Sequence, residues 1–191
     1  WASERDTLWN EVEQAETRKN STVAREFEIA LPAELPEDQR HRLTLDFVRE
    51  LVEQHGFAAE ASIHLPDDDG DNRNHHAHIL CSTRRLTAEG FGEKTRELDS
   101  MSTGPQEVKR WRERFAELGA HALEQAGYQL EADRFRHGHL RLEKQVEAAR
   151  ERGDLEFVAE HEGREPTRHL GPAATAIERR TGKPSNRRLD H

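Results

Sequence analysis

Residues 75–83, HHAHILCST, decide the fold of this chain because polar and apolar side chains alternate along them. Ala77 and Ile79 occupy one set of positions, and His76 and His78 occupy the other. Successive residues of a β-strand point to opposite faces of a sheet, so the pattern predicts a strand with one face in the core. The opposite face of this strand then carries two imidazoles side by side.

A second strand is predicted upstream, over residues 58–65, where His64 falls on the polar face. An acidic, glycine-containing connection over residues 66–74 joins the two strands. A strand, a polar turn and a second strand most simply form an antiparallel hairpin. We therefore expect His64 to lie beside His76 and His78.

Three neutral imidazoles form a site that borderline divalent ions favour, with positions left open for substrate oxygens. The pair His76 and His78 alone is more simply interpreted as polar residues on a sheet edge. The addition of His64 in hairpin register favours a metal site instead. Other histidines have no partner at ligand spacing and are interpreted as surface residues: His41, His55, His121 and His161.

A third strand is predicted over residues 23–31, where Phe27 and Ile29 alternate with Glu26 and Glu28. The two carboxylates share one strand face and could tune the ion, orient a histidine or act as a base. The alternative is the solvent-facing side of an edge strand, which the spacing supports about equally.

Helices are predicted between and after the strands, because apolar residues recur there every three or four positions. Their expected bounds are residues 5–18, 37–55 and 103–127. With the predicted strands, these helices give an α/β fold class, in the α+β sense, and the apolar stripe of the third helix should pack on the sheet. The sheet is expected to contain residues 22–32, 58–65 and 75–84, together with further strands that the pattern does not locate. Gly56 is expected to cap the second helix, and residues 84–96 are expected to form a loop.

Two parts are expected along the chain: residues 1–137 contain the sheet, and residues 138–191 form a charged helical extension with a flexible tail. A short helix is expected over residues 173–180, and the last ten residues are expected to be disordered. Only 33% of the residues are hydrophobic and 35% are charged, so the buried core must be modest.

The net charge and the single cysteine limit the classes of protein to which this chain can belong. A net charge of −9 argues against nucleic acid as a partner, but local basic clusters can still bind phosphates. Basic residues collect at residues 84–85, 94–96, 109–114 and 179–188, and any one of these clusters is more simply a solvated helix face. Cys81 cannot form an internal disulfide, which suits a reducing cytoplasm. Nothing resembles a signal peptide or an apolar span of about 18 residues, so no membrane insertion is expected.

Nucleophilic catalysis by the residues of this chain has little support. Cys81 falls on the core face of its strand, where a thiol is usually inert. Ser82 and Thr83 have no evident base. Tyr128 is the only tyrosine, follows Gly127 at the end of a long helix and is interpreted as a packing residue.

Several motifs in order resemble a known family. They are AREFEIALP at 24–32, ASIH at 61–64, NRNHHAHILCSTRRL at 72–86, GFGEKTRELD at 90–99 and HLGPAATAIERR at 169–180. Together with LWNEVEQAETRKN upstream, they are similar to the MobA/MobL-type plasmid mobilisation relaxases of the HUH endonuclease superfamily, which are close to the relaxase part of the TraA proteins. The resemblance covers most of residues 8–180.

The resemblance implies a central antiparallel sheet with helices packed on one face, and a divalent ion held by His64, His76 and His78, with Glu26 and Glu28 nearby. The candidate contacts to a DNA backbone are then Arg84, Arg85, Lys94 and Arg96. It implies magnesium or manganese in the cell, while three imidazoles would also take zinc or nickel in vitro. It further implies a bacterial cytoplasmic enzyme that nicks and rejoins single-stranded DNA at a plasmid origin of transfer through a 5′-phosphotyrosyl intermediate. Accessory relaxosome proteins and a type IV secretion coupling protein are the expected partners.

The chain departs from the family pattern at two places. The family's nucleophilic tyrosine lies upstream of the position that Trp1 occupies, so we expect this chain to bind metal and DNA but not to nick. The connection between His64 and His76 is longer and more acidic than usual, and His75 replaces the usual proline. Three alternatives stay open: a Rep-type HUH replication initiator, a hydrolase that uses metal-activated water with Glu26 or Glu28 as base, and a non-catalytic DNA-binding fragment.

Overall fold

The structure is a computed structural model that describes residues 4–66, 71–164 and 180–183. The chain divides into two compact units, Trp1–Arg141 and Leu142–His191. The sequence placed this boundary after residue 137, where helix α4 (Gln129–His137) ends, four residues before the division between the units. The first unit contains the sheet and every predicted site residue.

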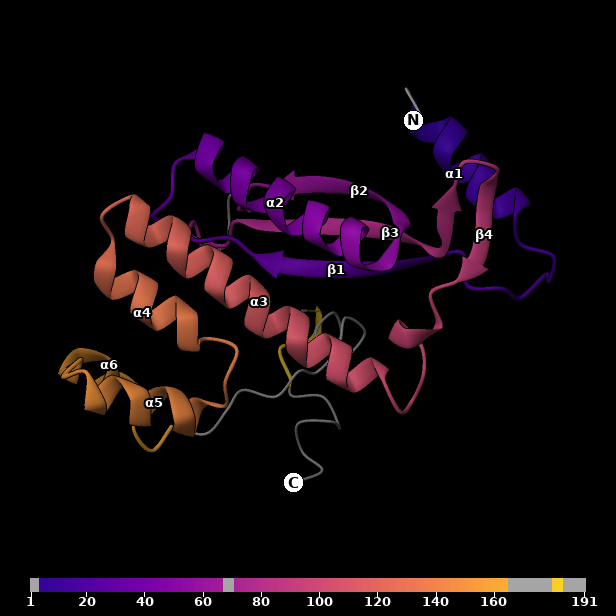
Figure 1. Cartoon of the computed structure of the whole chain (residues 1–191). Helices are drawn as coiled ribbons and strands as arrows, with labels where there is room; N and C mark the ends of the chain where they lie inside the picture. The colour runs from indigo at the N-terminus through magenta and orange to yellow at the C-terminus, as the bar shows by residue number, and fades with distance from the viewer. Residues whose placement is uncertain (1–3, 67–70, 165–179, 184–191) are drawn as a thin grey trace. The chain divides into compact units, whose positions relative to one another are not determined.

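Four antiparallel strands form the sheet in the described part of the chain (Figure 1). Their bounds are β1 (Ala24–Ala30), β2 (Phe57–His64), β3 (His76–Thr87) and β4 (Gly90–Lys94). Strand β3 lies between β1 and β2, and β4 pairs with the far end of β3. The predicted central antiparallel sheet is confirmed, with each predicted strand within a few residues of its expected place.

Helices cover one face of this sheet, as the sequence predicts (Figure 1). The described helices of the first unit are α1 (Arg5–Gln14), α2 (Glu37–His55), α3 (Gly104–Gln125) and α4 (Gln129–His137), with a 3-10 turn, η1, over Arg96–Leu98. α2 and α3 lie against the sheet, and α4 packs on α3. Gly119 permits that close packing, because a Cβ there would lie 2.1 Å from the Phe135 ring.

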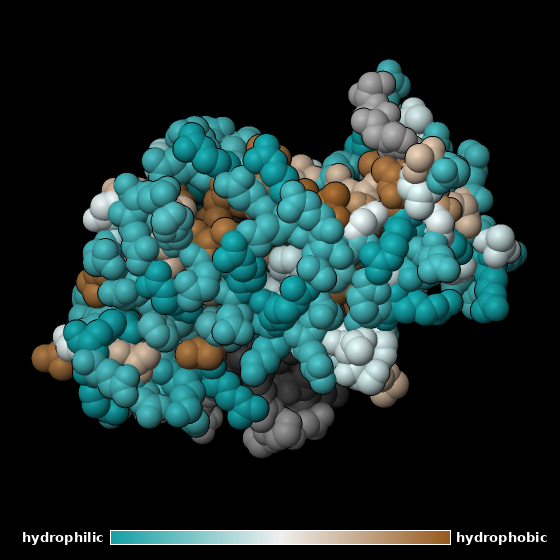
Figure 2. Space-filling view, viewed as in Figure 1, coloured by the Kyte–Doolittle hydropathy of each residue, from teal (hydrophilic) through white to brown (hydrophobic). Residues whose placement is uncertain are grey.

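The core lies between the sheet and the helices. Ile79 and Cys81 on β3 are fully buried, and Phe47, Leu51 and Trp111 on α2 and α3 are at most 4% exposed. The ring of Phe47 meets the ring of Trp111 edge-on, with centroids 5.7 Å apart. The outer surface of α2 and α3 is mostly hydrophilic, with apolar residues visible in small patches (Figure 2). No helix in the described part of the chain has the length and apolar character that a bilayer span requires.

Two sequence-based boundaries are wrong. Residues 84–96 are not a loop: β3 continues to Thr87 and turns into β4 at Gly90, whose φ of 113° favours glycine. The alternation in this segment is too weak to indicate strands, since Gly90 and Gly92 interrupt it. The first helix ends at Gln14 instead of residue 18. The expected helix cap is confirmed at Gly56, which has a φ of 70° and donates its N–H to the Val52 carbonyl.

The second unit contains a pair of short helices, α5 (Leu142–Glu151) and α6 (Leu155–His161). Val146, Ala149 and Val158 form its small buried cluster. The Asp154 carboxylate accepts the Phe157 backbone N–H and so begins α6. The helix expected over 173–180 and the last ten residues lie largely outside the described residues.

Candidate metal centre

The face of the sheet that α2 and α3 leave uncovered, which we call the open face, is a grid of residues from three strands. The pairing of β1 with β3 and of β2 with β3 sets the rows. From one end, the rows are Ala30–His76–His64, Glu28–His78–Ser62 and Glu26–Leu80–Glu60. The open face therefore carries both predicted carboxylates and all three predicted metal ligands.

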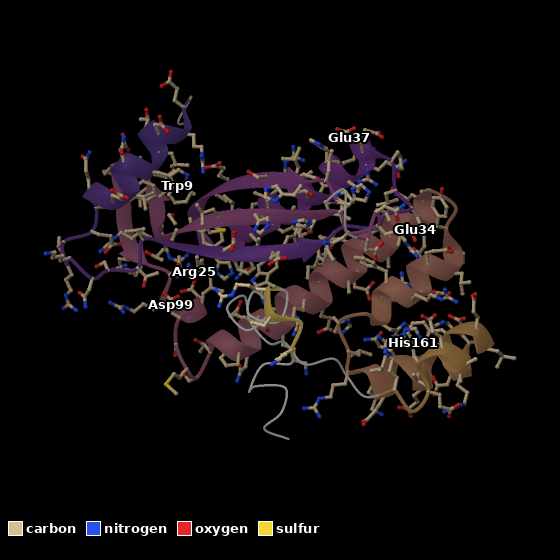
Figure 3. All side chains as sticks on the ribbon, turned by 180° about the vertical axis from the view of Figure 1, so that it is seen from behind. Trp9, Arg25, Glu34, Glu37, Asp99 and His161 are labelled. Carbon is tan, nitrogen blue, oxygen red and sulfur yellow. The ribbon has the colours of Figure 1, made fainter. Side chains whose placement is uncertain are left out.

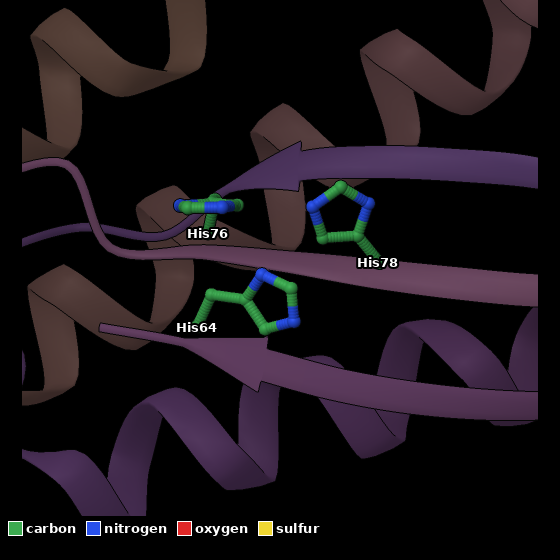
Figure 4. Close-up of side chains that lie close together, drawn as sticks. All are labelled: His64, His76 and His78. Atoms are coloured by element: carbon green, nitrogen blue, oxygen red, sulfur yellow. The ribbon is translucent and has the colours of Figure 1, made fainter. Parts of the chain in front are cut away.

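His64, His76 and His78 converge on this face (Figure 4). One nitrogen from each ring lies within 4.8 Å of the other two. The ring centroids are 4.6–5.2 Å apart. The hairpin register that was predicted from sequence is present, since His64 is paired directly with His76.

The three imidazoles fit a divalent ion. Two ligands of a single ion with bonds of about 2.1 Å can be no more than about 4.2 Å apart, so small ring rotations bring the three nitrogens within range. His64 is exposed and the other two rings are partly buried, which leaves the site open to a substrate. Neutral imidazole is a common ligand for borderline divalent ions.

Two hydrogen bonds determine which nitrogen of His76 and of His78 is available to a metal ion. The Nδ1 of His78 lies 2.8 Å from the Glu26 carboxylate, and the Nδ1 of His76 lies 3.0 Å from the Asn74 carbonyl. A carboxylate and a carbonyl can only accept, so each Nδ1 carries the hydrogen and each Nε2 keeps its lone pair. Such outer partners orient the ring and raise its basicity as a ligand.

Glu26 and Glu28 have different partners in the structure, although the sequence indicated the same possible roles for both. Glu26 hydrogen bonds to His78, although its side chain is 51% exposed. Glu28 is paired with His78 in the ladder and is exposed, and its side chain has no hydrogen bond or ion pair within the described part of the chain. Glu26 orients a predicted ligand, whereas Glu28 is free to meet a substrate or a solvent molecule.

His75 is not part of the cluster. Its carbonyl accepts the Leu31 N–H at 2.8 Å and extends the pairing of β1 beyond Ala30. Burial and the nearby charge of Arg40 lower the pKa of the His75 imidazole, so its neutral form is favoured. This residue supports the end of the sheet next to His76.

The four basic residues predicted to contact DNA gather around one polar cleft of about 1080 Å³. Three of them form ion pairs inside the protein. Arg84 and Lys94 contact the Glu16 carboxylate at 2.9 and 2.8 Å, and Arg85 contacts Glu97 at 2.7 Å. Arg96 forms no ion pair with any residue that the structure describes. Their role as DNA contacts stays a prediction.

Glu16 is a residue that the sequence did not single out. Its side chain is 5% exposed and lies between Arg84 and Lys94. Burial raises the pKa of this carboxyl, but hydrogen bonds from Arg84, Lys94 and Ser21 outweigh burial and lower the pKa to about 2. Glu16 thereby ties the segment after α1 to the β3–β4 hairpin.

His55 was expected at the surface and is instead 1% exposed. The Trp111 indole N–H donates to its Nε2 at 2.9 Å, so its Nδ1 carries the hydrogen that Glu97 accepts at 3.1 Å. Glu97 also binds Arg85. A lone histidine in the last turn of a helix gives no sequence signal for these partners, which come from α3 and η1.

Two residues considered as nucleophiles, Cys81 and Tyr128, differ in their burial. Cys81 is fully buried, and burial raises the pKa of its thiol to about 12, as its place on the core face predicts. Tyr128 was interpreted as a packing residue, but its side chain is 40% exposed just before α4. Tyr128 precedes α4, which packs on α3, and its backbone N–H donates to the Leu123 carbonyl of α3 at 2.9 Å.

The fold and the histidine cluster agree with a family match that spans most of the chain. A model of the MobA/MobL family matches residues 1–180. The chain belongs to the MobA/MobL family. This family of mobilisation and conjugal-transfer relaxases is the one that the sequence motifs resemble.

Individual relatives agree with the MobA/MobL assignment. The chain is 34% identical over 214 residues to the mobilization protein MobL of Acidithiobacillus ferridurans. This alignment covers 98% of the chain and 51% of that protein. It is 40% identical over 93 residues to the probable conjugal transfer protein TraA of Sinorhizobium fredii, covering 49% of this chain and 8% of that protein. The chain thus spans about half the length of the MobL relative.

A solved structure also has this fold. It comes from a study of the molecular basis of vancomycin resistance transfer in Staphylococcus aureus. The two proteins superpose with a TM-score of 0.54 at 30% sequence identity, covering 65% of this chain and 63% of the other.

Proposed function

We propose that this chain supplies the metal-binding and DNA-binding part of an HUH-type relaxase, which nicks and rejoins single-stranded DNA at a plasmid origin of transfer. The observation that carries the proposal is the convergence of His64, His76 and His78 on an open sheet face in a MobA/MobL chain. An exposed face suits a polymeric substrate better than an enclosed cavity would.

The three histidines would hold the ion, which is magnesium or manganese in the cell and could be zinc or nickel in vitro. A dication held there would neutralise the charge that builds up on the oxygens of a scissile phosphate. Glu26 keeps the His78 ring in the ligand orientation. Arg96, at the rim of the polar cleft, is the most available of the four predicted cations for a DNA phosphate.

The attacking group in this proposal is a tyrosine hydroxyl, giving a 5′-phosphotyrosyl intermediate and a free 3′-hydroxyl. Storing the phosphodiester covalently allows rejoining without an external energy source. Tyr128 lies between α3 and α4, which pack on each other, so it is not assigned as this nucleophile. The proposed setting is the bacterial cytoplasm, with accessory relaxosome proteins and a secretion coupling protein as partners.

A second candidate is a metal-dependent hydrolase that uses activated water. The free Glu28 carboxylate beside His78 favours it, because a general base must be unengaged and close to the nucleophile. The two reactions differ in their products. A relaxase leaves protein attached to the 5′ end of the cut DNA, whereas a hydrolase leaves two free ends.

The test uses the complete gene product, Mn²⁺ and a single-stranded oligonucleotide that carries the plasmid's transfer origin. We expect a covalent protein–DNA species that survives denaturing electrophoresis and is lost in His76→Ala or after chelation of the metal. Tyr128→Phe, the matched control, should form the adduct normally. Cleavage to free ends would support the hydrolase, and an undiminished adduct in His76→Ala would overturn the role of the histidines.

A further inference from the structure

Helix α1 and the residues that follow it lie against one end of the sheet and are held there at two places. The first place is on α1 itself. The Trp9 indole N–H donates to Oε2 of Glu60 at 2.6 Å, and the Arg5 guanidinium contacts Oε1 of the same carboxylate at 2.6 Å. After α1, Glu16 forms the buried ion pairs with Arg84 and Lys94. The segment is therefore fixed on the sheet at both of its ends.

The first of these contacts reaches the open face itself. Glu60 is in the third row of the grid, next to Leu80, and its side chain points to the same face as His64. His64 lies four positions after Glu60 along β2, a distance of about 13 Å of strand. Figure 3 looks at the molecule from behind and shows Trp9 between α1 and the near end of the central strands. α1 thus borders the open face on the side away from the first row.

Trp9 and Arg5 have the chemistry of a single-strand binding site. Proteins that bind single-stranded DNA combine cations for the backbone with aromatic rings on which bases stack. The Trp9 side chain stays partly exposed while its N–H is fixed by Glu60. The Arg5 side chain is 70% exposed and can meet a phosphate from its place on the Glu60 carboxylate.

Both sides of the open face carry carboxylates, and they differ in whether a cation and an aromatic ring stand beside them. The β1 side of the open face carries the exposed carboxylates Glu26 and Glu28. The carboxylate on the α1 side, Glu60, is already satisfied by Arg5 and Trp9, which lower its pKa against the opposing effect of burial. Because α1 and its N-cap also expose Glu4, Asp6, Glu11 and Glu13, the net charge does not choose between the two sides, and the choice rests on the Trp9 ring and the Arg5 cation.

We propose that Trp9 stacks on a base of the bound single strand, a short distance along the strand from the phosphate at the histidine cluster, and that Arg5 contacts the adjoining backbone. The inference rests on the proposed function, because it names where the same DNA strand goes after it leaves the metal. The competing explanation is that Trp9 and Arg5 only fasten α1 to the sheet.

The test compares two fluorescent probes in the presence of Mn²⁺: a dT 20-mer and a 20-mer of abasic units with the same phosphates. In fluorescence anisotropy, Trp9→Ala should weaken binding of the dT strand about tenfold and change binding of the abasic strand less than about twofold. Trp9→Phe, which keeps a ring but loses the N–H, should retain most of the affinity. Tyr128→Ala is the control, an exposed aromatic residue of the helical layer, and should change neither.

Arg5→Ala should weaken binding of both probes. It should also reduce the slope of log affinity against log salt by about 0.7, the value expected for one phosphate contact on a single strand. Arg42→Ala is its matched control, because Arg42 is 73% exposed and lies on α2 in the helical layer. Circular dichroism and Mn²⁺ titration check that each variant is folded. Should Trp9→Ala not fold, Trp9→Leu carries the same comparison, since it keeps apolar bulk without a π-face.

An equal loss for the dT and abasic strands in Trp9→Ala, or no loss for either, would overturn the stacking proposal while wild-type binding stays intact. A wild-type protein that binds neither strand would instead contradict the proposed function, and the inference with it. The two failures are therefore distinguishable in one set of measurements.

Discussion

The two faces of β3 have opposite environments although they alternate along one strand. Ala77, Ile79 and Cys81 are fully buried against the helical layer, whereas His76 and His78 are partly exposed on the open face. Packing of the core face against the helices fixes the position of β3, and this position brings the imidazoles together on the open face. The buried residues between and beyond the two histidines keep the ligand positions fixed, because a packed core leaves little freedom for the backbone.

The difference predicts that changes on the open face affect ligand binding and changes on the core face affect stability. A one-residue shift in register would exchange the two sets. Variants on adjacent positions of β3 can therefore separate chemistry from folding.

The largest effect is expected for His76→Ala on the open face. Loss of one of three ligands should weaken Mn²⁺ or Zn²⁺ binding more than about 100-fold, a larger effect than loss of an outer hydrogen-bond partner. Its free energy of unfolding without metal should change by less than about 1 kcal/mol, since the ring is partly exposed. Isothermal titration and urea unfolding measure the two quantities. Ser62→Ala, on the same face, is the control and should leave metal affinity unchanged.

The reverse pattern is expected for Ile79→Ala on the core face. Removing this fully buried side chain should lower the free energy of unfolding by about 3 kcal/mol through lost burial and a cavity. Under conditions where the variant remains folded, its metal affinity should stay within a few-fold of the wild type. A metal affinity that falls as far as in His76→Ala would show that the two faces are not separable.

Glu16→Gln tests whether the segment after α1 is held by its charge. The pKa of Glu16 in the folded protein is about 2, below its ordinary value of 4.5, so ionisation stabilises the fold above about pH 4.5. That stability is lost as the pH falls toward 2. We expect the variant to be about 2 kcal/mol less stable at pH 7, with the difference shrinking in acid. Urea unfolding at several pH values measures it, and a constant difference would contradict the charge-based explanation.

The smallest effect is expected for Glu26→Ala, which removes the hydrogen-bond partner of His78. Metal affinity should fall roughly tenfold, as for other residues that orient a ligand. Glu28→Ala is the matched control, because Glu28 lies on the same strand face and forms no hydrogen bond to a histidine within the described part of the chain. A similar loss in both variants would point to the general negative charge of β1 instead of the specific bond to His78.

The sequence was sufficient for the parts that depend on local pattern. Alternation along residues 75–83 and the position of His64 predicted the hairpin, its register and the convergence of three histidines. The resemblance to MobA/MobL proteins was confirmed by the family match. Period-two alternation determines which side chains share a face, so these features need no knowledge of distant contacts.

The features that the sequence could not give depend on distant contacts. His55 is buried by Trp111 and Glu97, which follow it by more than forty residues, and Glu16 is held by two cations of the β3–β4 hairpin. That hairpin was itself missed because glycines weaken its alternation. The spacing of Glu26 and Glu28 could not decide which carboxylate binds a histidine, since that depends on strand twist and rotamer.

The most direct test of the metal site is a crystal structure of this chain with Mn²⁺, with the ion located by its anomalous scattering. We expect one ion on the open face, bound by the Nε2 atoms of His64, His76 and His78, with Nδ1 of His78 still hydrogen bonded to Glu26. An ion bound elsewhere, or no ion at this face at millimolar Mn²⁺, would contradict the assignment of these three histidines as ligands.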